Sequence, residues 1–359
     1  MNIYTIQEWL FDHAEGKFDI DLAESGIQYH HLDDIPFSAN YDLNYSLDRG
    51  KSDLRQLIAD MYQQELHNVA ITHGAQEGLY LFYQSYLQPA DHVITFTPGW
   101  QQAWDVPRYI GAEVTTIKLL PENYYQIDVD KLAAAVKPNT KLIILTNPNN
   151  PTGTSATAQM DAIIEICKRQ SIFLICDEEY FVDYKNSIVN KYAYSAAVSS
   201  ISKVYGFPGL RVGWFISQKS IVEKVVNYKR FVTVSNSSLC EYLAMQVLKN
   251  YQKYLSEYDS ILENGYKIIA TWTQQHTEFV AVRPQGTPFV YLKLSKKLDS
   301  FDLCKKLLHR HKVLIMPAEV FEDSHALRVS YGRPEAILRE GLSKLSEVLL
   351  AEHETESIA

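Results

Sequence analysis

The sequence is poor in cysteine and has no surplus of positive charge. It carries four cysteines in 359 residues, and no two of them have the Cys-x-x-Cys spacing typical of zinc sites. No uncharged apolar run approaches the roughly 18 residues that a membrane-spanning helix needs. The formal net charge of −9 offers no basic surface for phosphates, which argues against nucleic acid as a partner. We therefore expect no metal site, no membrane span and a small-molecule partner.

The N-terminal residues and the scattered cysteines indicate the compartment. The first ten residues have neither a basic flank nor an apolar core long enough for export. The cysteines, Cys167, Cys176, Cys240 and Cys304, are too dispersed for a dense disulfide framework. A soluble protein of the reducing cytoplasm is expected.

Short apolar runs alternate with helical patterns over most of the chain, which is long enough for more than one domain. Strands that alternate with helices predict an α/β fold with a mainly parallel sheet. Apolar spacing predicts a helix over residues 52–66, with Ser52 as its cap. The expected strands cover residues 93–96, 142–145, 172–176, 197–201 and 213–216.

The pattern changes beyond residue 240. A long helical stretch through Ile269 is followed by expected strands at 289–294 and 327–330, as in a smaller α+β domain. We expect three parts, which are an N-terminal arm that covers the substrate (1–45), a large cofactor-binding domain (46–245) and a small C-terminal domain (246–359).

Polar and glycine-rich loops follow the expected strands. Ligands of such sheets bind at the carboxyl ends of the strands, so these loops should converge on one ligand. They cover residues 74–76, 98–100, 147–153, 177–180 and 200–203.

Two of these segments carry a specific resemblance. One is Ser200-Ile201-Ser202-Lys203, with Arg211 eight positions after the lysine, and the other is Asn147-Pro148-Asn149-Asn150-Pro151-Thr152-Gly153. Together they resemble the fold type I pyridoxal phosphate (PLP) enzymes of the aminotransferase class I/II family. The resemblance implies a seven-stranded sheet in the large domain, PLP as cofactor, and a homodimer.

The resemblance implies a role for each motif residue. Lys203 would form the covalent link to PLP and move the proton at the substrate Cα, in a site that favours the neutral amine. The PLP phosphate would be held by Arg211, the hydroxyls of Ser200 and Ser202, and the loop of Gly74, Ala75 and Gln76 at a helix start.

Further residues match the ring and substrate sites of the family. Asp177, at the end of an apolar strand, would bind the pyridinium nitrogen, whereas Glu178 and Glu179 suit a solvated turn. Tyr180 and Asn150 would bond the 3′ oxygen of the ring, and Trp100 would stack on it. Tyr45 would reach the phosphate across the dimer interface, and Arg328, beside Asn150, would hold the substrate α-carboxylate.

The cofactor motifs leave the reaction open. The segments 7–10, 21–27 and 72–81 look like those of capreomycidine synthase-like cyclases, which turn a hydroxylated arginine into a cyclic guanidine amino acid. In such a cyclase, Ser25 would contact a reacting group of the substrate and Gly26 would allow the chain to approach it closely. Glu8, Glu24 or Asp33 would hold the guanidinium of the substrate. An ordinary aminotransferase is the alternative. A non-catalytic PLP-binding regulator is disfavoured, because no DNA-binding segment precedes the fold.

Overall fold

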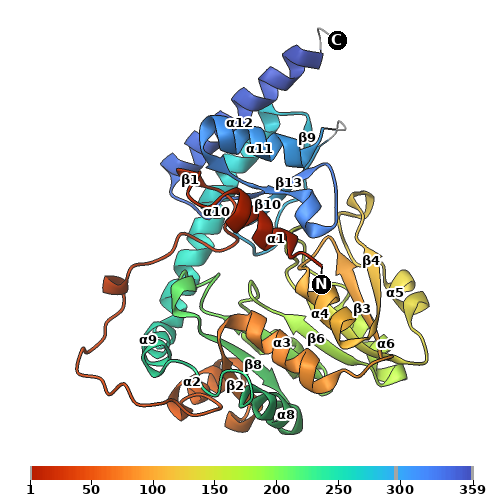
Figure 1. The fold of residues 1–359 in the computed structure, drawn as a ribbon, viewed down its shortest axis with the longest axis vertical. Helices are drawn as coiled ribbons and strands as arrows, with labels where there is room; N and C mark the ends of the chain where they lie inside the picture. The colour runs from red at the N-terminus through yellow and green to blue at the C-terminus, as the bar shows by residue number, and fades with distance from the viewer. Residues whose placement is uncertain (1, 295–297, 357–359) are drawn as a thin grey trace.

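The computed structural model describes residues 2–294 and 298–356. A mixed seven-stranded sheet forms the larger part of the molecule, and a second, smaller layer of sheet and helices lies beside it (Figure 1). The order of the large sheet is β2-β8-β7-β6-β5-β3-β4. Its strands are β2 (Val69–Thr72), β3 (His92–Thr97), β4 (Glu113–Lys118), β5 (Thr140–Thr146), β6 (Phe173–Asp177), β7 (Ser195–Ser200) and β8 (Gly213–Ser217).

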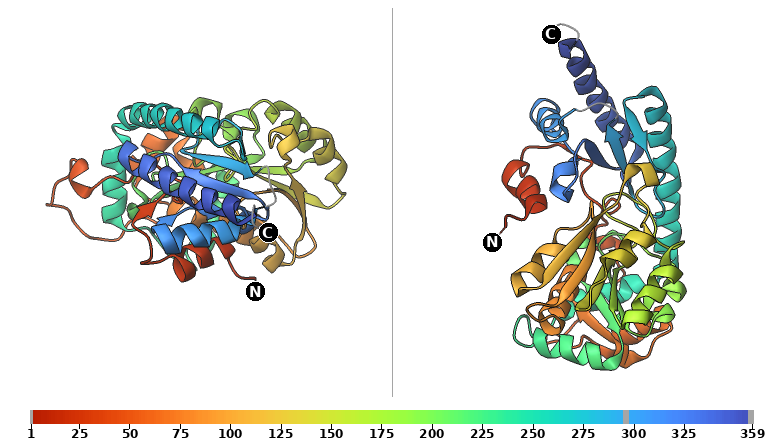
Figure 2. Two further views of the ribbon diagram at one scale, coloured as in Figure 1. Left: turned by 90° about the horizontal axis from the view of Figure 1, so that it is seen from above. Right: turned by 90° about the vertical axis from the view of Figure 1, so that its right-hand side faces the viewer.

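The central strands of this sheet are parallel, and β8 is antiparallel to both neighbours. Every residue of β3, β7 and β8 is buried, because helices cover both faces of the sheet (Figure 2). The helices of this part are α2 (Ser52–Tyr62), α3 (Gly74–Tyr86), α4 (Gln102–Ile110), α5 (Val129–Ala135), α6 (Met160–Gln170), α7 (Ile188–Lys191), α8 (Lys219–Lys229) and α9 (Ser238–Leu248).

Alternation along the strands separates two cores. Leu142 and Ile144 of β5 pack with α3 and α8, whereas Ile143 and Leu145 pack with α6 on the other face. Successive side chains of a strand point to opposite faces, so an unbroken apolar run is needed when both faces are covered. The predicted α/β fold is confirmed.

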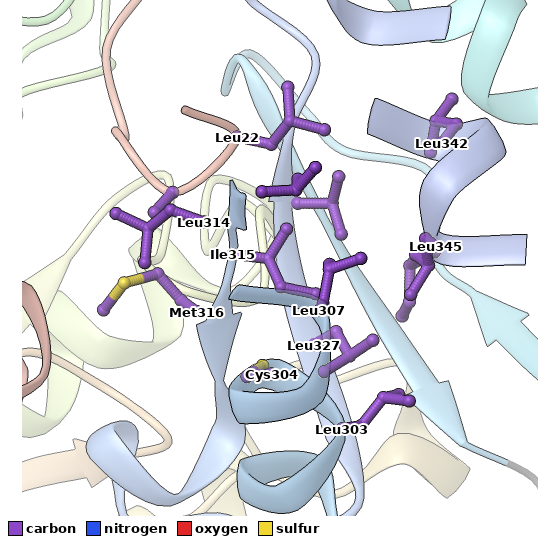
Figure 3. Packing of buried hydrophobic residues seen from close by; sticks show 14 of the residues in the cluster. Leu22, Leu303, Cys304, Leu307, Leu314, Ile315, Met316, Leu327, Leu342 and Leu345 are labelled. Carbon is purple, nitrogen blue, oxygen red and sulfur yellow. The ribbon is translucent and has the colours of Figure 1, made fainter. Parts of the chain in front are cut away.

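The smaller layer is an antiparallel sheet with the order β12-β13-β10-β9, flanked by long helices. Its core contains Leu303, Leu307, Leu327 and Leu342 (Figure 3). Its elements are α10 (Tyr251–Gln275), β9 (Phe279–Ala281), β10 (Phe289–Leu294), α11 (Ser300–His311), β12 (Met316–Pro317), β13 (Ala326–Ser330) and α12 (Glu335–Glu356).

The N-terminal segment packs on this smaller layer. Short helix α1 (Thr5–Gln7) continues into a π-helical turn (Glu8–His13), and β1 (Ile20–Asp21) pairs in parallel with β11 (Val313–Leu314). Trp9 is buried there, and its indole Nε1 donates a hydrogen bond to the carbonyl of Ile315 at 3.0 Å. Residues 5–26, called the N-terminal wall below, are therefore held against the smaller layer.

Two local predictions need correction. Helix α2 ends at Tyr62 rather than at residue 66, because Gln63 adopts a left-handed conformation, and Ser52 is its first residue while Lys51 occupies the cap. The long helical stretch after residue 240 is two helices, α9 and α10, with Asn250 between them. Apolar periodicity continues across this break and conceals it. The expected domain limits at residues 45 and 245 stay predictions.

All four cysteines are free. Within the described residues, no helix is long and apolar enough to cross a membrane.

Candidate active site

A cavity of about 680 Å³ lies at the carboxyl ends of β5 and β6, between the large sheet, the N-terminal wall and β13. It brings together residues that are far apart in the sequence. Of the predicted site residues, it is lined by Glu24, Ser25, Gly74, Ala75, Gln76, Trp100, Asn150, Asp177, Tyr180, Ser202, Lys203, Arg211 and Arg328.

Five expected site residues do not line this cavity. Gly26 and Ser200 lie directly behind its wall, in contact with residues that line it. Tyr45 is 90% exposed on a segment that projects from the side of the molecule (Figure 1). Glu8 and Asp33 are not among the lining residues, and on the π-helical turn Leu10 and Phe11 face the cavity instead.

Lys203 follows β7 and forms an ion pair across the cavity. Its Nζ donates to Oε1 of Glu24 at 2.7 Å. Burial alone would raise the pKa of Glu24, but the charge and hydrogen bond of Lys203 hold that pKa well below its usual range. The partner of the lysine is thus a carboxylate, and the expectation of a site that favours the neutral amine stays a prediction.

The segment around Glu24 is held closely against the lysine. A Cβ at Gly26 would lie 3.2 Å from Lys203 Cα, and the amide of Ile27 donates to the carbonyl of Lys203 at 3.2 Å. A glycine allows this approach because it has no side chain. The hydroxyl of Ser25 donates to Oε1 of Glu24 at 3.5 Å and also interacts with the side chain of Tyr180, so the segment contacts the loop after β6.

Asp177 ends β6 at the base of the cavity. Burial, together with the nearby charge of Glu179, raises the pKa of Asp177 well above its ordinary range. Its Oδ1 accepts the amide of Glu179 at 3.1 Å. A buried carboxylate of this kind is stabilised by a cation, and a protonated ring nitrogen would supply one.

The two acidic residues after Asp177 are not a solvated turn. Glu178 is 2% exposed and accepts the amide of Ile188 at 2.9 Å, and burial raises its pKa to about 7. Glu179 is 9% exposed, lines the cavity and accepts a hydrogen bond from the Ser200 hydroxyl at 3.0 Å. The expectation fails because the chain turns inward after β6.

Hydrogen bonds within the loop after β5 stabilise its conformation. Oδ1 of Asn147 accepts the amide of Ala156 at 2.8 Å, and Oδ1 of Asn149 accepts the hydroxyl of Thr152 at 2.8 Å. Asn150 is thereby fixed on the cavity wall, where its Oδ1 accepts a hydrogen bond from Arg328 Nη1 at 2.7 Å.

Arg328 comes from the middle of β13 and is 3% exposed. Its Nη2 donates to the carbonyl of Ala23, 305 positions earlier in the chain, and its buried Nε has no acceptor among the described residues. A buried guanidinium with a free donor suits a carboxylate ligand. Arg333 supports the same wall, since it donates to the carbonyls of Asp21 and Gly26.

The opposite end of the cavity offers donors for an anion. Gly74 begins α3, so the amides of its first turn have no partners within the helix and point to the cavity. A Cβ at Gly74 would lie 2.5 Å from Nη2 of Arg211, which places the guanidinium over this turn. Arg211 and the amides of this turn are the kinds of groups that bind a phosphate.

Several lining residues of the N-terminal segment were not assigned individually, although this segment was expected to cover the substrate. Gln7, Leu10, Phe11, Glu15, Phe18 and Asp21 form the outer wall. The spacing of Gln7, Leu10 and Phe11 on one helical face could have indicated this wall. For Glu179 the sequence offers no such signal, because its burial depends on the turn after β6.

These residues fit PLP. Lys203 can form the covalent link, Asp177 can neutralise the ring nitrogen, and Arg211 with the start of α3 can hold the phosphate. The bound cofactor would supply an electron sink for the bonds at the substrate Cα. Fold and site together define a PLP-dependent enzyme of fold type I.

The family follows from comparison with known proteins. The model for the family "Aminotransferase class I and II" matches residues 21–345, and the chain belongs to this family.

Capreomycidine synthase of Streptomyces vinaceus is 26% identical over 295 residues, which cover 79% of this chain and 75% of the relative. A PLP-dependent aminotransferase of Streptococcus suis superposes with a TM-score of 0.93 at 27% identity, over 98% of both chains. The PLP-dependent cyclase OrfR has a TM-score of 0.90 at 23% identity, again over 98% of both chains, and this likeness shows the fold alone.

Proposed function

We propose that this enzyme converts a hydroxylated L-arginine into a cyclic guanidine amino acid. The proposal is carried by one observation, the presence of Arg328 and of acidic side chains on the N-terminal wall in the same cavity. Arg328 suits the α-carboxylate of an amino acid, and the carboxylates of Asp21 and Glu15 suit a distal guanidinium. Glu24, one of the three acidic residues expected to hold the guanidinium, is engaged by Lys203. The sequence similarity to capreomycidine synthase supports this reading.

The chain's own residues account for the proton transfers. Lys203 takes the Cα proton, and the side-chain hydroxyl gains a proton and leaves as water. A guanidine nitrogen bonds to the carbon activated by this loss and gives up one proton, which balances the proton carried away in the water. Lys203 then returns a proton to Cα, so the net change is the loss of one water. Ser25 and Tyr180 border this space and would orient the reacting side chain.

An aminotransferase is the second candidate, and the similarity to the Streptococcus suis aminotransferase favours it. Such an enzyme would release a 2-oxo acid and require a second oxo acid to complete its cycle. Arg328 and Lys203 would serve equally well in that reaction.

The two candidates differ in what they consume. Holoenzyme is incubated with β- or γ-hydroxyarginine without any oxo acid, and the products are measured by mass spectrometry. The cyclase reading predicts a product lighter by one water, and unmodified L-arginine as control should give none. Product that forms only after 2-oxoglutarate or pyruvate is added would contradict the cyclase and establish an aminotransferase.

We further propose that the protein is a homodimer in which Tyr45 reaches the phosphate bound by the partner subunit. We also propose that the enzyme works in the cytoplasm. Exposed apolar side chains support the dimer, among them Leu43, Leu47 and Phe231, the last 84% exposed. The free cysteines are compatible with a reducing compartment. Sedimentation of the holoenzyme should give a dimer, and Tyr45→Phe should weaken PLP binding. A monomer with unchanged PLP affinity would contradict this arrangement.

A further inference from the structure

Glu24 reaches the reactive lysine from a segment 179 positions away in the sequence. The side chains of Glu24 and Lys203 are 34% and 24% exposed, and both lie on the cavity wall. The distance of 2.7 Å between their charged atoms is that of a charge-assisted hydrogen bond. This contact involves the same nitrogen that the cofactor chemistry uses.

The carboxylate of Glu24 is fixed in this position before any ligand arrives. The Gly26 amide donates to the same Oε1 at 2.9 Å, and Oδ1 of Asp21 accepts the amide of Glu24 at 3.0 Å. Nη1 of Arg333 donates to the carbonyl of Gly26 at 3.2 Å. A mobile surface acid would have to be ordered first, whereas this one is already oriented.

Other charges act on the same nitrogen or on Glu24 from neighbouring elements. Asp177 and Glu179, at the end of β6, both interact electrostatically with Lys203. Arg333, and Arg328 from β13, interact electrostatically with Glu24. Of the three carboxylates that act on Lys203, Glu24 accepts a hydrogen bond from Nζ, whereas Glu179 accepts one from the Ser200 hydroxyl.

Arg211 also lines the cavity and acts on Glu179. Its guanidinium packs over Gly74 at the anion end, where a bound phosphate would offset its charge. Glu24 is therefore the carboxylate in direct contact with Nζ among the charged groups named here.

We propose that Glu24 is a positioning residue that keeps a proton on the nitrogen of Lys203 while this nitrogen is linked to the cofactor. An opposite charge within about 4 Å favours the protonated form of a basic group. A protonated nitrogen in this link would make the cofactor carbon bonded to it a better acceptor for the substrate amino group. The role is independent of whether the enzyme is a cyclase or an aminotransferase.

The test uses holoenzyme without substrate. The visible absorbance of the link between Lys203 and PLP changes when its nitrogen loses a proton, so its midpoint can be titrated against pH. Glu24→Gln keeps the shape and removes the charge, and it should lower the midpoint by about one pH unit or more. Glu24→Asp, which withdraws the carboxylate by one methylene, should lower it by less.

Glu15→Gln is the matched control. Glu15 lines the same cavity, and within the described residues no ion pair joins it to Lys203. Its removal should leave the midpoint unchanged. An unchanged midpoint in Glu24→Gln at full PLP occupancy would overturn the proposal, and so would an equal shift in Glu15→Gln, because the effect would then be one of general cavity charge.

The test remains decisive if Glu24→Gln does not fold, and it is separate from the test of the proposed reaction. If Glu24→Gln fails to fold, the Glu24→Asp titration decides, since an unchanged midpoint there with an intact fold also contradicts the proposal. Because no substrate is present, failure of this proposal is distinct from failure of the proposed cyclase reaction.

Discussion

At the cofactor end of the cavity, the lining residues sit in loops between strands of one sheet, whereas at the substrate end they come from distant segments of the chain. Ala23 and Arg328, for example, are 305 positions apart. Asp177 and Lys203 follow the neighbouring strands β6 and β7. Ala23 and Arg328 meet only because β13 lies against the N-terminal wall. The comparison suggests that the first end supports chemistry common to the family and the second selects the substrate.

The largest expected effect comes from the cofactor end. Asp177→Asn removes the carboxylate that suits the ring nitrogen, and kcat should fall by about 10²- to 10³-fold. The fall should be equal for amino acids with different side chains, as steady-state kinetics can show. Glu178→Gln, which changes a buried carboxyl outside the cavity lining, should leave kcat unchanged. If kcat fell by different factors for different amino acids, the proposed division into a cofactor end and a substrate-selecting end would be wrong.

At the substrate end, Arg328→Lys should lower kcat/KM by roughly 10- to 100-fold, because a lysine cannot make two parallel bonds to a carboxylate. The visible spectrum of the bound cofactor should stay unchanged. The control is a substrate whose α-carboxylate is replaced by an amide. The wild type should turn over this amide with a low kcat/KM, and Arg328→Lys should lower that kcat/KM only slightly further. If Arg328→Lys lowered kcat/KM for the amide as much as for the carboxylate substrate, the assignment of Arg328 would be contradicted.

A smaller loss of activity is expected at Gly26, where the N-terminal segment packs against Lys203. In Gly26→Ala the new Cβ would lie 3.2 Å from Lys203 Cα and 3.3 Å from the carbonyl oxygen of Ser202, so the wall or the lysine must shift by a few tenths of an ångström. We expect kcat to fall roughly 3- to 10-fold. Gly209→Ala is the matched control, because nothing lies within 4 Å of its added Cβ. Equal kinetics for the two variants would show that the close approach has no consequence.

The smallest effect concerns stability rather than activity. Burial raises the pKa of Glu178 to about 7, above the value of about 4.3 in an unfolded chain. The folded enzyme therefore binds this proton more tightly, and the associated stability is present below about pH 4.3 and is lost as the pH rises to about 7. Glu178→Gln should raise the thermal midpoint relative to wild type by about 2–4 °C at pH 8 and by less at pH 5. A difference that does not change with pH would contradict the raised pKa.

The sequence predicts the cofactor end better than the substrate end for a physical reason. Parallel strands bring their following loops to one edge, so the segments at Asn150, Asp177 and Lys203 could be placed together without a structure. The contact between Glu24 and Lys203 depends on how the N-terminal wall packs on the smaller layer, which no local pattern encodes. For the same reason Glu8 was expected near the substrate although Gln7 and Leu10 line the cavity.

The sequence also failed to indicate that some polar residues are buried. Glu178 and Glu179 have the composition of a solvated turn, yet Ile188 and Ser200 provide hydrogen bonds that allow both to be buried. The edge strand β4 was not predicted, because its burial is partial and its sequence mixes polar and apolar residues. Tertiary contacts, rather than local propensity, decide these positions.

The central claim, that the substrate end directs a common cofactor chemistry toward cyclisation, is tested most directly by counting product molecules per active site. Holoenzyme is mixed with excess hydroxyarginine and no oxo acid, and product and cofactor form are followed together. The account predicts many turnovers with the cofactor retained as PLP. A single equivalent of product per site, with the cofactor left in its amine form, would contradict it.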